Sequence, residues 1–183
     1  AMLDEFLKHD PYSKVACETF CTTGLVVVGG EISSLGEGKV KVDGIVRETV
    51  EKIGYNKASY KFDSESCGVI SAIHEQSGDI RQGVVEGEGL YKEQGAGDQG
   101  MMFGYATNET ESQIPITLQL SHMILREMAA IRKEGKIMKY LGPDSKSQVT
   151  VQYNNRGRAE SVHTIVVSTQ HDDFDEEQAM LDL

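Results

Sequence analysis

The feature that most constrains this chain is a glycine-rich stretch without regular patterning, which separates two patterned segments. It covers residues 77–112 and holds eight glycines. On both sides of it, apolar residues recur at the spacings of strands and helices. A loop of this length inside a compact domain is usually functional or mobile. The sequence therefore predicts two folded segments that flank a functional or mobile loop.

The first segment combines helices with strands. Residues 3–9 have the pattern of a helix that Pro11 stops. Alternation and a turn across residues 14–32 predict a β-hairpin. Apolar residues at helical spacing predict a second helix over 42–53 that ends at Gly54, and residues 67–73 are typical of a buried strand.

The second segment repeats this combination. The clearest helix of the chain is predicted over residues 115–133, with one apolar face formed by Ile116, Leu120, Ile124, Met128 and Ile131. Gly142, Pro143 and Asp144 predict a break in the chain. Residues 149–153 and 162–169 alternate around a turn and predict a second hairpin. The acidic residues 172–183 have the pattern of a helix that begins as the sequence ends.

This order of hairpins and helices favours an α+β fold with mixed or antiparallel sheets and helices packed on one face, over a doubly wound parallel fold. We expect a first α+β domain over residues 1–112, which includes the loop. Residues 113–183 then form part of a second α+β domain, truncated at its C-terminus.

Charge and composition narrow the classes of function. With 18 Lys and Arg against 29 Asp and Glu, the net charge of −11 argues against nucleic-acid binding. No apolar run approaches the about 18 residues that a membrane helix needs, and the first residues do not resemble a secretory signal. Three cysteines without metal-ligand spacing are typical of reduced thiols in the cytoplasm.

One short motif could carry chemistry. In residues 95–100, Gly-Ala-Gly-Asp-Gln-Gly, the glycines allow a backbone to approach a ligand closely, and Asp98 offers an acceptor for an ammonium or hydroxyl group. The motif is neither a Walker loop nor a Rossmann fingerprint. Taken alone, it is more typical of a turn with a solvated aspartate than of a binding site.

In context, the chain resembles the S-adenosylmethionine synthetases (methionine adenosyltransferases) from about Leu3 to its end. The resemblance rests on runs in the family's order and at compatible spacing: VACET at 15–19, GGEI at 29–32, HEQSGDIRQGV at 74–84, GAGDQGMMFGYATNET at 95–110, PDSKSQVTVQY at 143–153 and HTIVVSTQHDD at 163–173. It implies an enzyme that transfers the adenosyl group of ATP to the sulfur of methionine and releases phosphate and pyrophosphate.

The resemblance implies a methionine site built from acidic and amide side chains. Glu31 would bind the amino group of methionine, and Gln76 would contact the same substrate. Asp98 would hold the amino acid near the reacting sulfur and so act as a catalytic residue. The loop at about residues 77–95 would be the family's mobile active-site lid.

The resemblance also implies an ATP site and two metal ions. Asp144 and Lys146 would meet the ribose and the phosphate chain, with Lys146 as the second catalytic residue. Glu18 would lie at the site of K⁺, and Mg²⁺ would accompany the triphosphate. The implied partners are ATP, methionine and further copies of the subunit in a dimer or tetramer, and no membrane or nucleic acid.

The chain also departs from the family. The family's N-terminal Gly-His-Pro-Asp-Lys segment and its basic second half do not occur in this sequence, and Gly142 stands where the family usually has Arg. Because the chain opens within a helical pattern and closes at the start of another, we expect a fragment that is inactive alone. The alternative is a short, non-catalytic homologue that binds and regulates a full-length synthetase.

Overall fold

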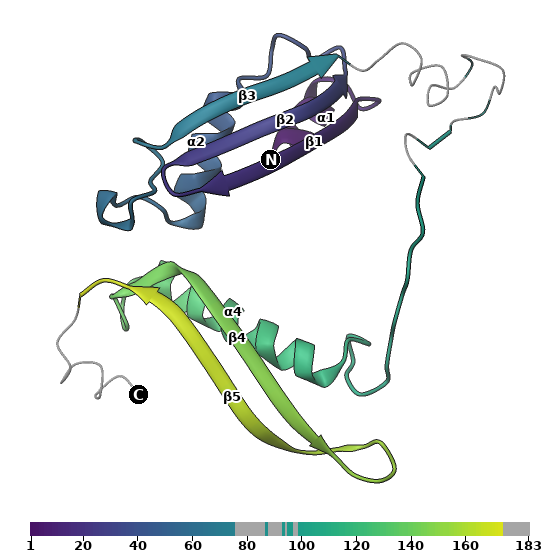
Figure 1. Ribbon diagram of the computed structural model, residues 1–183, viewed down its shortest axis with the longest axis vertical. Helices are drawn as coiled ribbons and strands as arrows, with labels where there is room; N and C mark the ends of the chain where they lie inside the picture. The colour runs from purple at the N-terminus through teal and green to yellow at the C-terminus, as the bar shows by residue number, and fades with distance from the viewer. Residues whose placement is uncertain (76–86, 88–92, 94, 97–98, 174–183) are drawn as a thin grey trace. The chain divides into compact units, whose positions relative to one another are not determined.

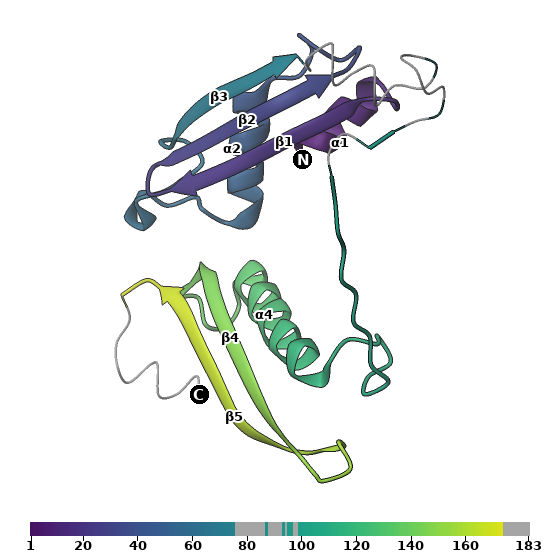
Figure 2. The same ribbon diagram turned by 45° about the vertical axis from the view of Figure 1, so that its right-hand side comes forward.

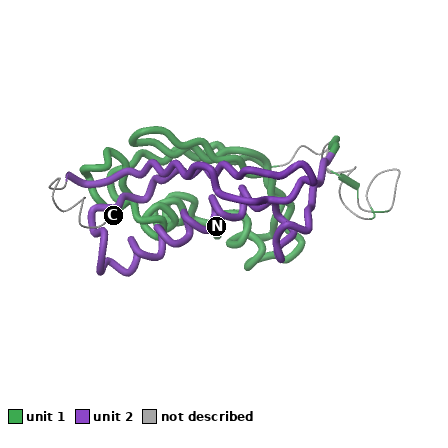
Figure 3. Tube along the Cα trace, turned by 90° about the horizontal axis from the view of Figure 1, so that it is seen from below, with its two compact units in different colours: residues 1–101 green, residues 102–183 purple. Residues whose placement is uncertain are grey.

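The computed structural model describes residues 1–75, 87, 93, 95–96 and 99–173. It divides into two compact units, Ala1–Met101 and Met102–Leu183, which carry different colours in Figure 3. Both units combine helices with β-sheet, so the predicted α+β class is confirmed. Each unit is described by itself below.

The first unit contains a three-stranded sheet in the order β1-β2-β3 (Figure 1). Strand β1 (Lys14–Thr22) pairs antiparallel with β2 (Leu25–Ser33), and β2 pairs parallel with β3 (Gly68–Glu75). The predicted hairpin is thus present, and its turn places Gly24 at a φ of 71°. Positive φ is accessible to glycine without steric cost, which explains the tight turn.

The helices of this unit cover one face of the sheet (Figure 2). They are α1 (Met2–His9) and α2 (Val42–Ile53), and the short 3₁₀ helix η1 (Ala58–Tyr60) follows α2 in the chain. Gly54 ends α2 in the left-handed conformation, as the sequence predicts. The core forms where Val26 and Val28 of β2 pack with Val46 and Val50 of α2. Alternate residues of β2 therefore point into the core, and the others point to the opposite face.

The prediction of a buried third strand was wrong. Val69 and Ile73 pack against the core, but the residues between them are exposed, and Ile70 is 51% exposed. Strand β3 is an edge strand that has helices on one face only. An apolar run therefore indicated a strand correctly but did not indicate how many of its faces are covered.

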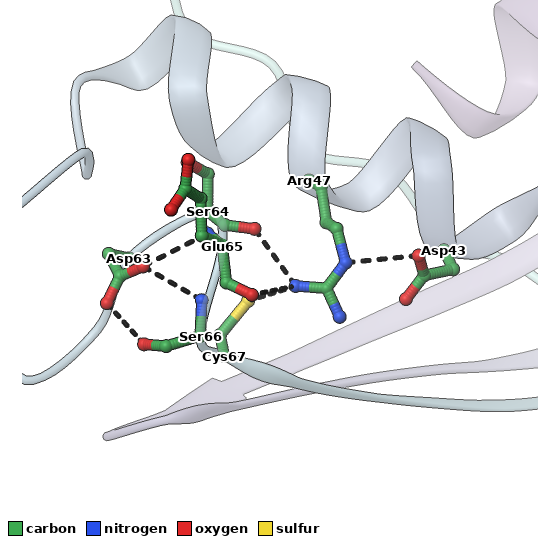
Figure 4. A network of polar contacts seen from close by, with 7 residues as sticks. All are labelled: Asp43, Arg47, Asp63, Ser64, Glu65, Ser66 and Cys67. Atoms are coloured by element: carbon green, nitrogen blue, oxygen red, sulfur yellow. Dashed lines mark hydrogen bonds and ion pairs between the residues drawn. The ribbon is translucent and has the colours of Figure 1, made fainter. Parts of the chain in front are cut away.

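A polar network fixes the loop that leads into β3 (Figure 4). Arg47 on α2 donates from Nη1 to the carbonyl oxygens of Ser64 at 2.9 Å and Glu65 at 3.0 Å, while its Nε donates to Asp43 at 3.0 Å. Asp63 accepts the backbone N–H groups of Glu65 and Ser66 and the Ser66 hydroxyl. The loop is thereby attached to α2 and closed on itself immediately before the strand.

The second unit packs one helix on a long antiparallel hairpin. Helix α4 (Ile116–Glu134) lies against β4 (Leu141–Tyr153), which pairs with β5 (Ala159–His171). The predicted apolar face of the helix is half-buried along its length. Glu109 accepts the N–H of Ile116 at 3.0 Å, so its carboxylate satisfies a free donor at the helix start.

The predicted break at Gly142-Pro143-Asp144 was wrong. These residues lie inside β4, which begins at Leu141. The register pairs Leu141 with His171 and Ser145 with Thr169, so three residues of β4 face the single residue Gln170. A bulge of this kind tolerates proline because the bulged residues make no regular ladder hydrogen bonds.

Two predicted features fall mostly beyond what the structure describes. They are the mobile lid at about residues 77–95 and the acidic helix start at 172–183. Among the helices in the described ranges, none is both long and apolar enough to cross a membrane.

Candidate functional site

Two of the predicted site carboxylates lie on the open face of the first unit's sheet, the face that no described helix of this unit covers. Glu31 on β2 pairs with Ala16, and Glu18 on β1 pairs with Gly29, so the two glutamates are diagonal neighbours. Such positions have Cα atoms about 7–8 Å apart. Both residues are exposed. This arrangement concentrates negative charge on one end of the open face.

The same face changes character along the strands. On the β3 side of β2, His74 pairs with Glu31. At the opposite end, Phe20 pairs with Val27 and Val27 with Ile70, and Phe20 is 63% exposed. The open face therefore has an acidic end that can bind a cation or an ammonium group, and an apolar end that can pack against another surface.

Gly30 determines how closely β1 and β2 approach beside Glu31. Its φ is +134°, and a Cβ at this position would lie 2.0 Å from the carbonyl oxygen of Ala16. Any side chain would force the strands apart at the residue pair next to Ala16 and Glu31. The glycine is thus a structural requirement of the strand that presents the carboxylate.

The second unit presents the predicted ATP-binding residues. Asp144 and Lys146 are both exposed, two positions apart on β4, while Ser145 and Ser147 between and after them are half-buried. This pattern of exposure indicates that Asp144 and Lys146 both point to the solvent side of β4. A carboxylate and an ammonium group two residues apart can bind a hydroxyl and a phosphate of one ligand.

The structure places four of the six predicted site residues. Glu18 and Glu31 share one face of the first unit, and Asp144 and Lys146 share one strand of the second. Gln76 and Asp98 lie outside the described residues. Their predicted roles, like those of the four placed residues, stay predictions.

The described residues do not form a complete metal site. Within residues 1–75 and 99–173 and the few placed between them, no group of three or more His, Cys, Asp or Glu side chains could hold an ion. Glu18 and Glu31 offer carboxylate oxygens of the kind that hard cations prefer. Two carboxylates alone do not form a Mg²⁺ site, and K⁺ binding stays a prediction for Glu18 only.

Sequence reasoning missed residues that act through the backbone. Two adjacent glycines inside a strand pattern, Gly29 and Gly30, were a signal of close approach. Arg47 carried no signal, because a lone arginine on a helix is usually a solvated residue. Gln170 carried none either, since its importance comes only from its position opposite the bulge in β4.

Comparisons with known proteins also divide the chain into two successive parts. A family model described as the N-terminal domain of S-adenosylmethionine synthetase matches residues 1–78. A second model, described as the central domain of the same synthetase, matches residues 93–182. The two matches together leave only the loop region and the last residue uncovered.

Curated relatives give the same result. The chain is 56% identical over 180 residues to an S-adenosylmethionine synthase of Cytophaga hutchinsonii, covering 98% of the chain and 42% of the relative. It is 58% identical over 174 residues to one of Bacteroides thetaiotaomicron, covering 95% of the chain and 40% of the relative. The chain thus spans about two fifths of the length of these relatives. Because the N-terminal and the central domain models both match, this chain belongs to the S-adenosylmethionine synthetase family.

Proposed function

We propose that this chain is part of a synthetase that transfers the adenosyl group of ATP to the sulfur of methionine and releases phosphate and pyrophosphate. The observation that carries the proposal is the match of two successive synthetase domain models along nearly the whole chain. The acidic end of the open face and the Asp144–Lys146 pair are the chemical groups that such a reaction requires.

The reaction joins a neutral sulfur nucleophile to the ribose 5′-carbon and expels a triphosphate. The carbon–oxygen bond to the triphosphate breaks as the carbon–sulfur bond forms, and the sulfur becomes a sulfonium cation. Water then hydrolyses one P–O–P bond of the triphosphate, which gives the released phosphate and pyrophosphate. Carboxylates near this sulfur stabilise the positive charge as it develops. In our proposal Glu31 binds the methionine ammonium with Gln76, and Asp98 lies near the sulfur.

The leaving group needs fixed positive charge. Lys146 contributes one ammonium group for the phosphate chain, and Asp144 accepts a hydrogen bond from the ribose. Bound Mg²⁺ would neutralise part of the triphosphate charge. We infer that K⁺ binds at Glu18, whose exposed carboxylate lies on the same face as Glu31. The net charge of −11 supports a site in which bound cations or basic residues outside this chain supply further positive charge.

We further propose that the protein is a cytoplasmic homo-oligomer with a domain boundary near residue 112. Exposed apolar side chains on the sheets support self-association, since large apolar patches mark interaction surfaces. They include Phe20 and Ile70 on the open face, and Val162, Ile165, Val166 and Val167 on β5.

The chain by itself is expected to be inactive. It spans about two fifths of the length of its relatives. Lys146 is the one lysine to which we assign a phosphate-binding role. Removing a single group that stabilises a transition state commonly costs ~100-fold to 1,000-fold in turnover. The alternative function is a short, non-catalytic homologue that docks on a full-length synthetase.

The test compares the 183-residue chain with a protein extended by the flanking coding sequence. Both are incubated with labelled methionine, ATP, Mg²⁺ and K⁺, and the sulfonium product is measured. We expect product from the extended protein and none from the chain. Inactivity of both would contradict the proposed function, and turnover by the chain alone would contradict its dependence on further segments. An open reading frame that encodes only the chain would favour the alternative.

A further inference from the structure

The bulge in β4 contains Asp144, and its conformation depends on the residue across from it. Three residues of β4, Gly142, Pro143 and Asp144, stand opposite Gln170 of β5. Bulges next to functional sites re-aim side chains, but they lose the ladder hydrogen bonds that hold a regular strand. The backbone around Asp144 therefore needs other contacts to fix its position.

The side chain of Gln170 supplies one such contact. Its Oε1 accepts the backbone N–H of Asp144 at 3.5 Å. Thr169 adds a second contact: its Oγ1 lies 3.4 Å from the Asp144 carbonyl oxygen, 3.0 Å from the Gln170 carbonyl oxygen and 2.9 Å from Oγ of Ser145, and its single proton can serve one of them at a time. The backbone N–H of Asp144 is thus held by the Gln170 side chain, and its carbonyl oxygen lies within reach of the Thr169 hydroxyl.

Gly142 gives Gln170 the space for this conformation. A Cβ on Gly142 would lie 2.8 Å from Cγ, 2.9 Å from Cβ and 2.9 Å from Oε1 of Gln170. The glutamine side chain therefore packs directly over the glycine backbone, and both residues are at least partly buried. A side chain at position 142 would compete for the same space.

We propose that Gln170 is a positioning residue, which fixes the bulged backbone of β4 so that Asp144 presents its carboxylate to the ribose of ATP. The inference rests on the proposed function and adds to it a residue that does not touch the substrate. Gly142 belongs to the same device, because it leaves room for the glutamine. The carboxylate of Asp144 itself stays exposed and available to the ligand.

The experiment uses the full-length protein and four variants: Gln170→Met, Asp144→Asn, the double variant and the control Gln152→Met. Methionine keeps the length of glutamine over Gly142 but removes the amide acceptor. The control makes the same chemical change on an exposed residue at the far end of the same hairpin. Initial rates are measured against ATP and against methionine, and thermal midpoints report on folding.

We expect Gln170→Met to raise the KM for ATP by about threefold to tenfold, the effect of one lost hydrogen bond. The KM for methionine and the kcat should stay close to their wild-type values, as should every constant of the control. In the Asp144→Asn background, Gln170→Met should add less than about twofold, because residues that act through one another are not additive.

Deoxy analogues of ATP supply a readout that loss of folding would not move. The analogues are 2′-deoxy-ATP and 3′-deoxy-ATP. With the analogue that lacks the hydroxyl bound by Asp144, Asp144→Asn should no longer raise the KM. With that same analogue, the effect of Gln170→Met on the KM should also shrink. If Gln170→Met does not fold, Gln170→Asn, which withdraws the acceptor by one methylene, takes its place.

The outcomes separate the proposed role of Asp144 in ATP binding from the positioning role of Gln170. An inactive full-length protein, or an unchanged KM for ATP in Asp144→Asn, overturns the proposed role of Asp144 and this inference with it. A raised KM in Asp144→Asn with none in Gln170→Met overturns the inference alone. Full additivity of the two substitutions, or equal losses for ATP and methionine, overturns it as well.

Discussion

Gly30 and Ala16 approach so closely that the α-carbon of Gly30 has no room for a side chain on the Ala16 side. A Cβ would lie 2.0 Å from the Ala16 carbonyl oxygen. We expect Gly30→Ala to destabilise the protein by about 2–4 kcal/mol, through this overlap and the strained φ of +134°. The measurement is the thermal or denaturant midpoint of the intact protein.

Gly44→Ala is the matched control for this substitution. Gly44 lies in α2, and a Cβ there would meet no atom within 4 Å. Alanine is favoured over glycine in a helix by roughly 0.5–1 kcal/mol, so this change should be neutral or stabilising. Equal midpoints for the two alanine variants would show that β1 and β2 do not need a glycine beside Glu31.

The loop before β3 should depend on Arg47. Arg47→Met removes the donors to the carbonyl groups of Ser64 and Glu65. We therefore expect faster hydrogen exchange at the amides of Cys67 and Gly68, which bond to Asp63 and to Gly24. Lys52→Met, which breaks only the exposed pair with Glu48, is the control and should leave these amides protected. Unchanged protection in the Arg47 variant would contradict this role.

Asp63 should make the protein sensitive to acid. Hydrogen bonds from Ser66 and Glu65 hold the pKa of its carboxyl below the ordinary value of 3.8, although burial opposes them. A depressed pKa in the folded state stabilises the protein fully above the ordinary value, and this contribution is lost as the pH falls toward the folded value. Asp63→Asn should therefore lower the thermal midpoint at pH 7, and the difference from the wild type should shrink as the pH falls below 3.8.

The control for this pH series is Asp173→Asn, an exposed change of the same charge. It separates the effect of net charge from the effect of the network around Asp63. Parallel curves for wild type and Asp63→Asn down to the lowest pH would contradict the prediction.

Glu18 should govern the response to potassium. In the full-length synthetase, Glu18→Gln should raise the half-activating K⁺ concentration by about fivefold, which corresponds to roughly 1 kcal/mol for an exposed charge. Activity at saturating K⁺ should largely recover, because the neutral amide keeps an oxygen ligand. Glu48→Gln on α2 is the control, and an unchanged K⁺ response in the Glu18 variant would exclude this residue as a ligand.

Local sequence patterns predicted the helices and strands of the fold but did not predict which strands pair with one another. Helix α2 and its end at Gly54 followed from helical spacing and a left-handed C-cap, which both depend on near neighbours in sequence. The parallel pairing of β3 with β2 did not follow, because alternation identifies a strand without naming its neighbour. For the same reason, the exposure of Ile70 was not predictable.

The candidate site shows the same limit. The resemblance pointed to Glu31, Asp144 and Lys146 because their sequence runs are distinctive. Gln170 could not be found in this way, since its effect on Asp144 depends on a bulge that sets three residues against one. Proline and glycine in the bulge instead suggested that the strand ends there.

The direction in which β2 and β3 pair decides where the chain leaves the first sheet. Because the two strands run parallel, Glu75 at the end of β3 lies beside Ile32, the neighbour of Glu31. An antiparallel partner would have released the chain at the other end, beside Leu25 and the apolar residues. The end of β3 therefore lies at the acidic end of the open face. Insertions just after Glu75 should therefore affect methionine binding before they affect the stability of the sheet.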